Sequence, residues 1–246
     1  MTGDTALLRT SSVSKRFRGV VALADASIHL NEGEILGVIG PNGAGKTTLF
    51  NVIAGAMRPS SGTVTFRGRD ITRLPADRRL RLGLARTFQL MKPFTSLSVY
   101  DNVVVGATGG GLSLRRARAR ADEIIDRLGM GDIAARPASA INAVQAKRLE
   151  LARALSADPA VVLLDEIFSG LRADEVDDLA GHVRALPSQG RTVMMIEHNL
   201  PAIRSVSERV LALSAGRVIS EGRPDEVFNA PEVVSSYLGN RGRTAR

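Results

Sequence analysis

The stretch that decides the fold is GPNGAGKTT, Gly40 to Thr48. It matches the phosphate-binding pattern G-x-x-x-x-G-K-[ST], and it stands between an apolar run, EILGVIG, and a helical run, KTTLFNVIAGA. Its glycines let the backbone wrap around a phosphate with its N–H groups pointing inward. The motif and its context therefore predict a nucleoside triphosphate site.

We expect every residue of this loop to contact the nucleotide. The lysine supplies a compact cation for the β- and γ-phosphates, and the hydroxyl of Thr47 is predicted to be a ligand of Mg²⁺. The predicted nucleotide-binding residues of the loop are Gly40, Pro41, Asn42, Gly43, Ala44, Gly45, Lys46, Thr47 and Thr48.

Two further apolar runs, AVVLLDE and TVMMIEH, resemble EILGVIG in composition. All three are apolar on both faces, as strands of a covered parallel sheet are. Ligands of open α/β sheets bind beyond the carboxyl ends of the strands, so the residues that end these runs are site candidates. Asp165 is predicted to hold Mg²⁺, directly or through water, and Glu166 to orient or deprotonate an attacking water.

The composition is that of a globular domain with a substantial core. The 246 residues carry a formal net charge of +8 and contain no cysteine, which excludes disulfides and thiolate metal sites. No apolar run approaches the length of a membrane span, and the first residues lack the apolar core of a signal peptide, so we expect a cytoplasmic location. Much of the positive charge lies in residues 114–128, which we interpret as a solvated helix face, and no nucleic-acid partner is predicted.

Residues 91–157 differ from the rest of the chain in their pattern of apolar residues, because helical spacing dominates there. GATGGGLS, Gly106 to Ser113, is predicted to be a flexible connection between helices, and Leu114 is expected in the apolar stripe of the next one. After Val210, VLALSAGRVISEG predicts two short strands around a turn. We predict one nucleotide-binding domain over 1–246, with an ATP-binding core at 1–90 and 158–246 and a helical subdomain at 91–157.

The stretch INAVQAKRLELARAL, Ile141 to Leu155, predicts a helix with a capping box formed by Asn142 and Gln145. The free N–H groups and the positive dipole end of such a helix start favour an anion.

Together with the loop, the motifs LLDE, RTFQ and EHN make the chain resemble the nucleotide-binding subunits of ABC transporters over nearly its whole length. The resemblance implies an α/β P-loop fold with an N-terminal antiparallel β subdomain and a helical insertion, and it implies ATP and Mg²⁺ as cofactors. It implies that Gln89 senses Mg²⁺ and the attacking water, that His198 contacts the γ-phosphate, and that Phe17 stacks on adenine. A lone phenylalanine is also a common core residue, which is the alternative for Phe17.

Residues 141–145 occupy the position of the family signature, usually Leu-Ser-Gly-Gly-Gln, whose helix start faces the ATP bound by a partner subunit. The resemblance therefore implies that Asn142, Ala143, Val144 and Gln145 contact that nucleotide. The branched side chain of Val144 replaces a glycine and should hinder close approach of the backbone to phosphate. Ile167, in place of the usual proline, and Arg172, in place of Asp or Asn, are further departures.

RTFQLMKPFTSLSVYDNV and GRPDEVFNAPEVVSSYLG resemble the ATP-binding subunits of branched-chain amino acid importers. The resemblance implies ATP hydrolysis at a dimer interface that drives uptake of branched-chain amino acids or a related small polar solute. It implies three kinds of partner: a second ATP-binding subunit in a homo- or heterodimer, transmembrane permease subunits contacted near Phe94 and Leu97, and indirectly a solute-binding protein. The chain would then lie on the inner face of the cell membrane.

Two alternatives stay open, and a third is disfavoured. The first is a hydrolysis-impaired subunit that serves ATP-dependent dimerisation, for which the altered signature is the support. The second is the ATPase of a lipopolysaccharide-export-like transporter, which shares LSVYDN and the YLG ending. A soluble ABC ATPase acting on DNA or ribosomes predicts tandem cassettes or long heptads, and the sequence contains neither.

Overall fold

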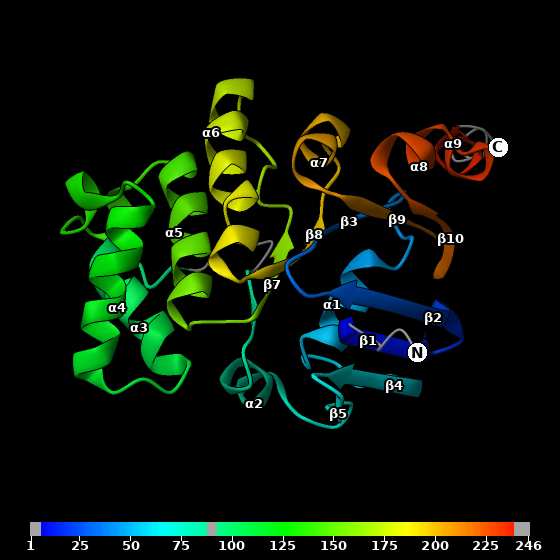
Figure 1. The fold of residues 1–246 in the computed structure, drawn as a ribbon, viewed down its shortest axis with the longest axis horizontal. Coiled ribbons are helices and arrows are strands. Elements are labelled where there is room, and N and C mark those ends of the chain that lie inside the picture. The colour runs from blue at the N-terminus through cyan, green and yellow to red at the C-terminus, as the bar shows by residue number, and fades with distance from the viewer. Residues whose placement is uncertain (1–5, 88–92, 239–246) are drawn as a thin grey trace.

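The computed structural model describes residues 6–87 and 93–238. A layered α/β core carries a small antiparallel sheet at one end and a block of helices at the other (Figure 1). The strands are β1 (Ala6–Phe17), β2 (Val20–Asn31), β3 (Ile35–Ile39), β4 (Ser61–Phe66), β5 (Arg69–Asp70), β6 (Leu84–Arg86), β7 (Val161–Asp165), β8 (Thr192–Ile196), β9 (Arg209–Ser214) and β10 (Arg217–Gly222). The helices are α1 (Lys46–Ile53), α2 (Ala76–Arg81), α3 (Val99–Gly109), α4 (Leu114–Arg127), α5 (Ala143–Ser156), α6 (Ala173–Arg184), α7 (Leu200–Val206), α8 (Pro224–Asn229) and α9 (Pro231–Leu238), with short 3₁₀ turns at 131–133, 138–140 and 187–189.

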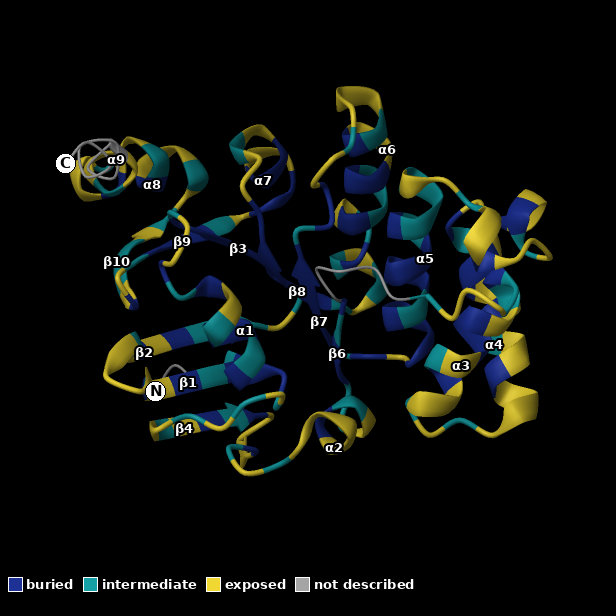
Figure 2. Cartoon of the chain, turned by 180° about the vertical axis from the view of Figure 1, so that it is seen from behind, coloured by how far each residue is buried: buried dark blue, intermediate teal, exposed yellow. Residues whose placement is uncertain are grey.

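The central sheet has six strands in the order β10-β9-β3-β8-β7-β6. Its strands are parallel except β10, which pairs antiparallel with β9. The three apolar runs form β3, β7 and β8, and all of their residues are buried, as the sequence predicts (Figure 2). Because these three strands are neighbours and parallel, their carboxyl ends open on the same edge of the sheet. The predicted pair of strands after Val210 is confirmed as β9 and β10.

The N-terminal part of the chain forms the predicted antiparallel subdomain, a sheet in the order β2-β1-β4-β5. Apolar residues of this sheet, such as Leu23 and Val64, share one buried cluster with Leu49 and Phe50 of α1 and with Met194 of β8. The antiparallel sheet and the central sheet therefore enclose α1, and this packing fixes the helix that follows the phosphate-binding loop.

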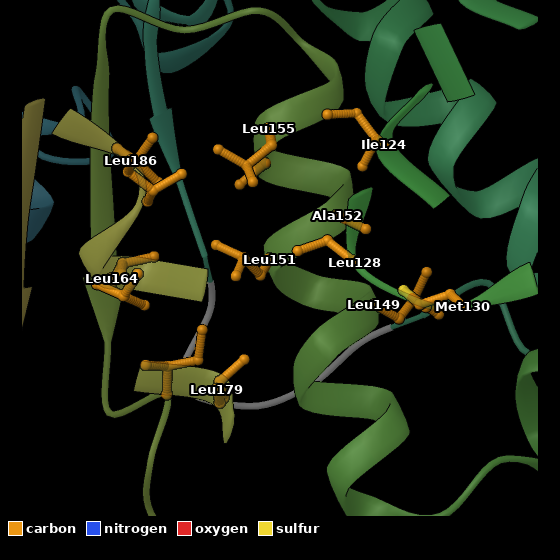
Figure 3. Close-up of a cluster of buried hydrophobic side chains, with 14 of the residues drawn as sticks. Ile124, Leu128, Met130, Leu149, Leu151, Ala152, Leu155, Leu164, Leu179 and Leu186 are labelled. Carbon is orange, nitrogen blue, oxygen red and sulfur yellow. The ribbon is translucent and has the colours of Figure 1, made fainter. Parts of the chain in front are cut away.

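Helix α5 lies between the central sheet and the other helices of the insertion. Figure 3 shows Leu151 and Leu155 pointing toward Leu164 of β7 and toward Leu186, whereas Leu149 lies on the opposite side, beside Met130. All of these residues belong to one buried cluster. Helix α5 is thus packed against the central sheet on one side and against the other helices on the opposite side. This packing positions its N-terminus relative to β7.

Two expectations for this region were wrong. Helix α3 continues to Gly109, so the connection is shorter than the predicted segment of residues 106–113. The reason is packing: a Cβ atom on Gly106 would lie 2.5 Å from Oγ of Ser156 and 2.6 Å from the carbonyl oxygen of Arg153, so this glycine permits close contact between α3 and α5. Leu114 is 55% exposed because it is the first residue of α4, one turn before the stripe enters the core.

Across residues 6–87 and 93–238, none of the helices combines the length and the apolar character that a bilayer-spanning segment requires.

Candidate functional site

The phosphate-binding loop runs from the end of β3 to the start of α1. Gly40, Gly43 and Gly45 have φ values of 147°, 79° and 105°. A Cβ atom on Gly45 would lie only 2.4 Å from the carbonyl oxygen of Ala22 in β2, so any side chain would push the loop away from the antiparallel sheet. Glycine is therefore required here both by the backbone conformation and by the close contact with β2.

Lys46 opens α1 and turns its side chain back into the loop. Its Nζ donates to the carbonyl oxygens of Gly40 at 2.6 Å and Pro41 at 3.1 Å. Burial lowers the pKa of the Lys46 ammonium, and the carboxylates of Glu166 and Asp165 act in the opposite direction. The loop thus holds a cation at its centre, where an anionic ligand would interact strongly with it.

A cleft of about 510 Å³ opens in front of this loop. It combines the loop with an aromatic ring and two of the polar residues that end strands. Its lining consists of Phe17, Ala22, Asn42, Gly43, Ala44, Gly45, Lys46, Thr47, Thr48, Glu166 and His198. The P-loop, the carboxylate, the imidazole and the phenyl ring that the sequence singled out are therefore gathered around one space.

Phe17 ends β1, next to the loop. Its side chain is 42% exposed, and Nζ of Lys15 lies 5.2 Å from the centroid of its ring. The alternative that Phe17 is a core residue is wrong, since a core ring would be covered. An exposed ring at the edge of a polar cleft offers a flat apolar face for a heterocyclic base. Contact with adenine stays a prediction.

Asp165 ends β7 and is 2% exposed. Its Oδ2 accepts a hydrogen bond of 2.7 Å from Nη2 of Arg86. The other terminal nitrogen of Arg86, Nη1, donates to Oδ1 of Asn51. Its Oδ1 is buried and has no hydrogen-bond partner among the residues that the structure describes. An unsatisfied buried carboxylate oxygen is costly, and a divalent cation is the group that it would best accommodate. Asp165 therefore fits the predicted Mg²⁺ site.

Glu166 follows directly, with a left-handed backbone (φ 50°) that is uncommon for a residue with a side chain. Its N–H donates to the carbonyl oxygen of Ile196 at 2.9 Å, which ties it to the end of β8. Its Oε1 lies 2.8 Å from Nε2 of His198. The carboxylate and the imidazole thus contact each other at the wall of the cleft.

The four predicted signature residues lie outside this cleft. Asn142 caps α5 and forms the predicted capping box: its Oδ1 accepts from the N–H of Gln145 at 2.9 Å, and its own N–H donates to Oε1 of Gln145 at 3.0 Å. Asn142 and Ala143 are exposed, and Val144 and Gln145 are partly exposed. The helix start is therefore open to a ligand that lies outside this chain. Gln89, the remaining predicted site residue, is outside the described residues.

Sequence reasoning missed four polar residues that contact the site. Arg86 holds Asp165, and the hydroxyl of Tyr237 in α9 accepts from the N–H of Gly40 at 2.8 Å. Nζ of Lys147 in α5 donates to the carbonyl oxygen of Glu166 at 2.7 Å. Glu197 accepts from the N–H of Phe168 at 2.7 Å, and burial raises its pKa to about 7. Only Glu197 had a readable signal, because it directly follows a buried strand, as Glu166 does.

Comparison with known proteins agrees with this geometry. A family model described as ABC transporter matches residues 23–169. The high-affinity branched-chain amino acid transport ATP-binding protein LivG of Salmonella typhimurium is 34% identical, over 95% of this chain and 98% of its own. The lipopolysaccharide export system ATP-binding protein LptB of Haemophilus influenzae is 33% identical, over 96% of this chain and 98% of its own.

Solved structures give the same assignment. A nucleotide-free ATP-binding cassette from an ABC transporter superposes with a TM-score of 0.87 at 30% identity, covering 94% of this chain and 98% of that one. An ATP-binding cassette of an ABC transporter in its ADP conformation also superposes with a TM-score of 0.87 at 30% identity. This match covers 95% of this chain and 99% of that one. The fold, the loop and its cleft, and these relatives lead to one conclusion: the chain belongs to the ATP-binding proteins of ABC transporters.

Proposed function

We propose that this chain hydrolyses ATP at a dimer interface and thereby drives uptake of branched-chain amino acids or a related small polar solute. The observation that carries the hydrolytic part is the contact between Glu166 and His198 on the wall of the cleft that holds the P-loop. The chain is the ATP-binding subunit of an ABC transporter, as its family membership shows.

The placement of the described residues supports the following chemistry. The loop N–H groups and Lys46 bind the phosphates, and Thr47 and Asp165, with Gln89 as a further ligand, hold Mg²⁺. When bound, Mg²⁺ neutralises charge on the transferred phosphoryl group. Glu166 takes a proton from the attacking water, and His198 orients Glu166 and contacts the γ-phosphate. Phe17 stacks on the adenine.

Dimerisation is proposed because the chain cannot place its own signature residues against its own nucleotide. Asn142 and Ala143 are exposed at the start of α5 and do not line the cleft in front of Lys46. A second ATP-binding subunit, arranged head to tail, would bring its P-loop to this helix start. Because Val144 is bulkier than the usual glycine, a hydrolysis-impaired subunit remains the second candidate.

The permease is proposed to dock between α3 and α5. Phe94 is 45% exposed, and its ring lies 5.2 Å from Cζ of Arg153. The two side chains line a largely apolar cleft of about 210 Å³ together with Val105 and Ala154. Leu97 is only partly exposed, so it offers less contact area than Phe94. Docking here would keep the chain at the inner membrane face, with a solute-binding protein on the other side.

Support for import comes from relatives named for branched-chain amino acid transport, among them LivG of Escherichia coli at 33% and BraF of Pseudomonas aeruginosa at 31% identity. The relative named for lipopolysaccharide export is equally similar, which makes such an ATPase the other candidate transporter.

The test has two parts. Phosphate release from Mg-ATP by the purified chain should fall on chelation of Mg²⁺ with EDTA and should be lost in Glu166→Gln. Proteoliposomes that contain the chain with its co-purified permease, with ATP on the side of the chain and the solute-binding protein on the other, should then take up labelled leucine. Hydrolysis without leucine uptake would remove the branched-chain amino acid assignment and keep the ATPase, and absence of hydrolysis in a dimer that binds ATP would favour the impaired subunit.

A further inference from the structure

Helix α5 carries a buried lysine that contacts the main chain of Glu166. Lys147 is 8% exposed, and its Nζ donates to the carbonyl oxygen of Glu166 at 2.7 Å. Lysine is rarely buried unless it is paired, because its charge loses solvation. Burial lowers the pKa of the Lys147 ammonium, while the carboxylates of Glu197 and Glu166 act in the opposite direction and favour its charged form. This lysine is therefore held at one place by both a hydrogen bond and the surrounding charge.

The backbone that Lys147 contacts is an unusual one. Glu166 has a φ of 50°, a conformation that persists only when the surroundings impose it. Its N–H is held by Ile196, and its carbonyl oxygen accepts from Nζ of Lys147 and, at 3.3 Å, from the N–H of Ser169. The lysine gives the shorter of the two bonds to this oxygen. Since the backbone conformation sets the direction of Cβ, these bonds decide where the carboxylate of Glu166 points.

The other side of the same turn is held by the residue that precedes His198. Oε1 of Glu197 accepts from the N–H of Phe168, two residues after Glu166, at 2.7 Å. Lys147 and Glu197 thus hold two successive parts of the turn after β7, and the ionised form of Glu197 attracts the ammonium of Lys147. The carboxylate of Glu166 and the imidazole of His198 project from this braced turn and lie 2.8 Å apart.

We propose that Lys147 is a positioning residue for hydrolysis, which fixes the main chain of Glu166 so that its carboxylate faces the attacking water. The inference rests on the proposed function, because it takes Glu166 as the base. It adds a physical link between two parts of the site. Lys147 lies within two turns of the Asn142 cap, so its bond connects the start of α5 to the carboxylate.

The experiment compares the parent and five variants of the full chain by steady-state phosphate release and by ATP titration in the absence of turnover. Lys147→Met keeps the apolar stem and removes the donor, and Lys147→Arg keeps a donor and the charge. Arg148→Met is the matched control, because it removes a cation from the next residue of α5, whose partner is Asp178 of α6. Melting temperatures show whether each form is folded.

We expect Lys147→Met to lower kcat by about tenfold or more while Kd for ATP stays within about twofold, the signature of a group that acts only in the reaction. Lys147→Arg should recover most of the lost kcat, and Arg148→Met should match the parent. In the Glu166→Gln background, Lys147→Met should cause no further loss, because the group that it positions is already gone. A purely structural role would instead change the melting temperature and ATP binding together.

Parental kcat in a folded Lys147→Met protein would overturn the inference, and so would a full additional loss in the Glu166→Gln background. If Lys147→Met does not fold, Lys147→Gln replaces it: the amide is too short to reach the Glu166 carbonyl, so turnover equal to that of Lys147→Arg would also overturn the inference. Failure of the proposed function would give a different result: the parent itself would show no ATP hydrolysis that depends on Glu166.

Discussion

Nε2 of His198 and Oε1 of Glu166 lie 2.8 Å apart, although the residues come from different strand ends. The cause is the register of the central sheet, in which Asp165 of β7 pairs with Ile196 of β8. The residues that follow these two strands therefore meet beyond the same edge. A carboxylate that contacts an imidazole in this way is oriented before any substrate arrives, which is what a general base requires.

Replacing Glu166 or His198 should lower the rate of ATP hydrolysis more than it lowers the affinity for ATP. We expect Glu166→Gln to lower the rate of ATP hydrolysis by about a hundredfold or more, because the amide cannot accept a proton. His198→Ala should cost about tenfold, equivalent to about 1.4 kcal/mol of transition-state stabilisation. In a fluorescence titration Glu166→Gln should bind ATP like the parent, and His198→Ala should lose less in binding than in turnover. Parental turnover in Glu166→Gln would mean that another group is the base.

Lys46→Ala should act on binding itself. Its ammonium stands at the centre of the loop, and charge-assisted hydrogen bonds to phosphate are among the stronger polar interactions. We expect the Kd for ATP to rise about tenfold or more, as the loss of one bond to a charged group implies. Arg204→Ala, which removes a cation from an exposed ion pair with Asp225, is the control and should leave Kd unchanged. Equal Kd values for Lys46→Ala and the parent would contradict the phosphate assignment.

Stability should depend on pH through Glu197. Burial raises the pKa of this carboxyl to about 7 in the folded protein, from about 4.3 in the unfolded chain. Between these values the folded state binds more protons than the unfolded state, so the free energy of unfolding falls as the pH rises. At about 1.4 kcal/mol per pKa unit, we expect a loss on the order of 2 kcal/mol between pH 5 and 8 that Glu197→Gln does not share.

The measurement is urea unfolding at several pH values. Glu232→Gln, which removes an exposed carboxylate from α9, is the control and should follow the parent. Parallel stability curves for the parent and Glu197→Gln would show that Glu197 is charged in the folded protein throughout this range.

The altered signature should limit turnover. A triple change, Asn142→Ser, Ala143→Gly and Val144→Gly, restores the usual residues at the start of α5. Serine is as good a cap as asparagine, and each glycine costs up to about 1 kcal/mol of helix stability. If phosphate contacts are gained, each donor to the developing charge is worth about 3 kcal/mol, so we expect ATPase activity of the homodimer to rise about tenfold or more. An unchanged rate in protein shown to dimerise would mean that the signature does not limit the enzyme.

The sequence predicts the parts of this molecule that obey local rules. The loop at Gly40–Thr48, the buried strands and the Asn142 cap depend on motif and periodicity, and each was readable. Gly106 was misread because its closeness to Ser156 is a tertiary contact that local composition does not encode. The same holds for Lys147: that its ammonium would contact the carbonyl oxygen of Glu166 depends on how α5 is clamped against β7, and no spacing along the chain reports it.

Strand β3, which carries the phosphate-binding loop, hydrogen-bonds to β8 on one side and to β9 on the other. A ribosome makes β3 long before its two neighbours, at 192–196 and 209–214. Until both neighbours are made, the nascent chain therefore carries a fully apolar strand without the partners that later cover its edges, which is the kind of segment that aggregates or recruits chaperones. Such long-range pairing also slows folding. The pairing that positions the phosphate-binding loop in the folded protein thus depends on segments that the ribosome makes well after the loop itself.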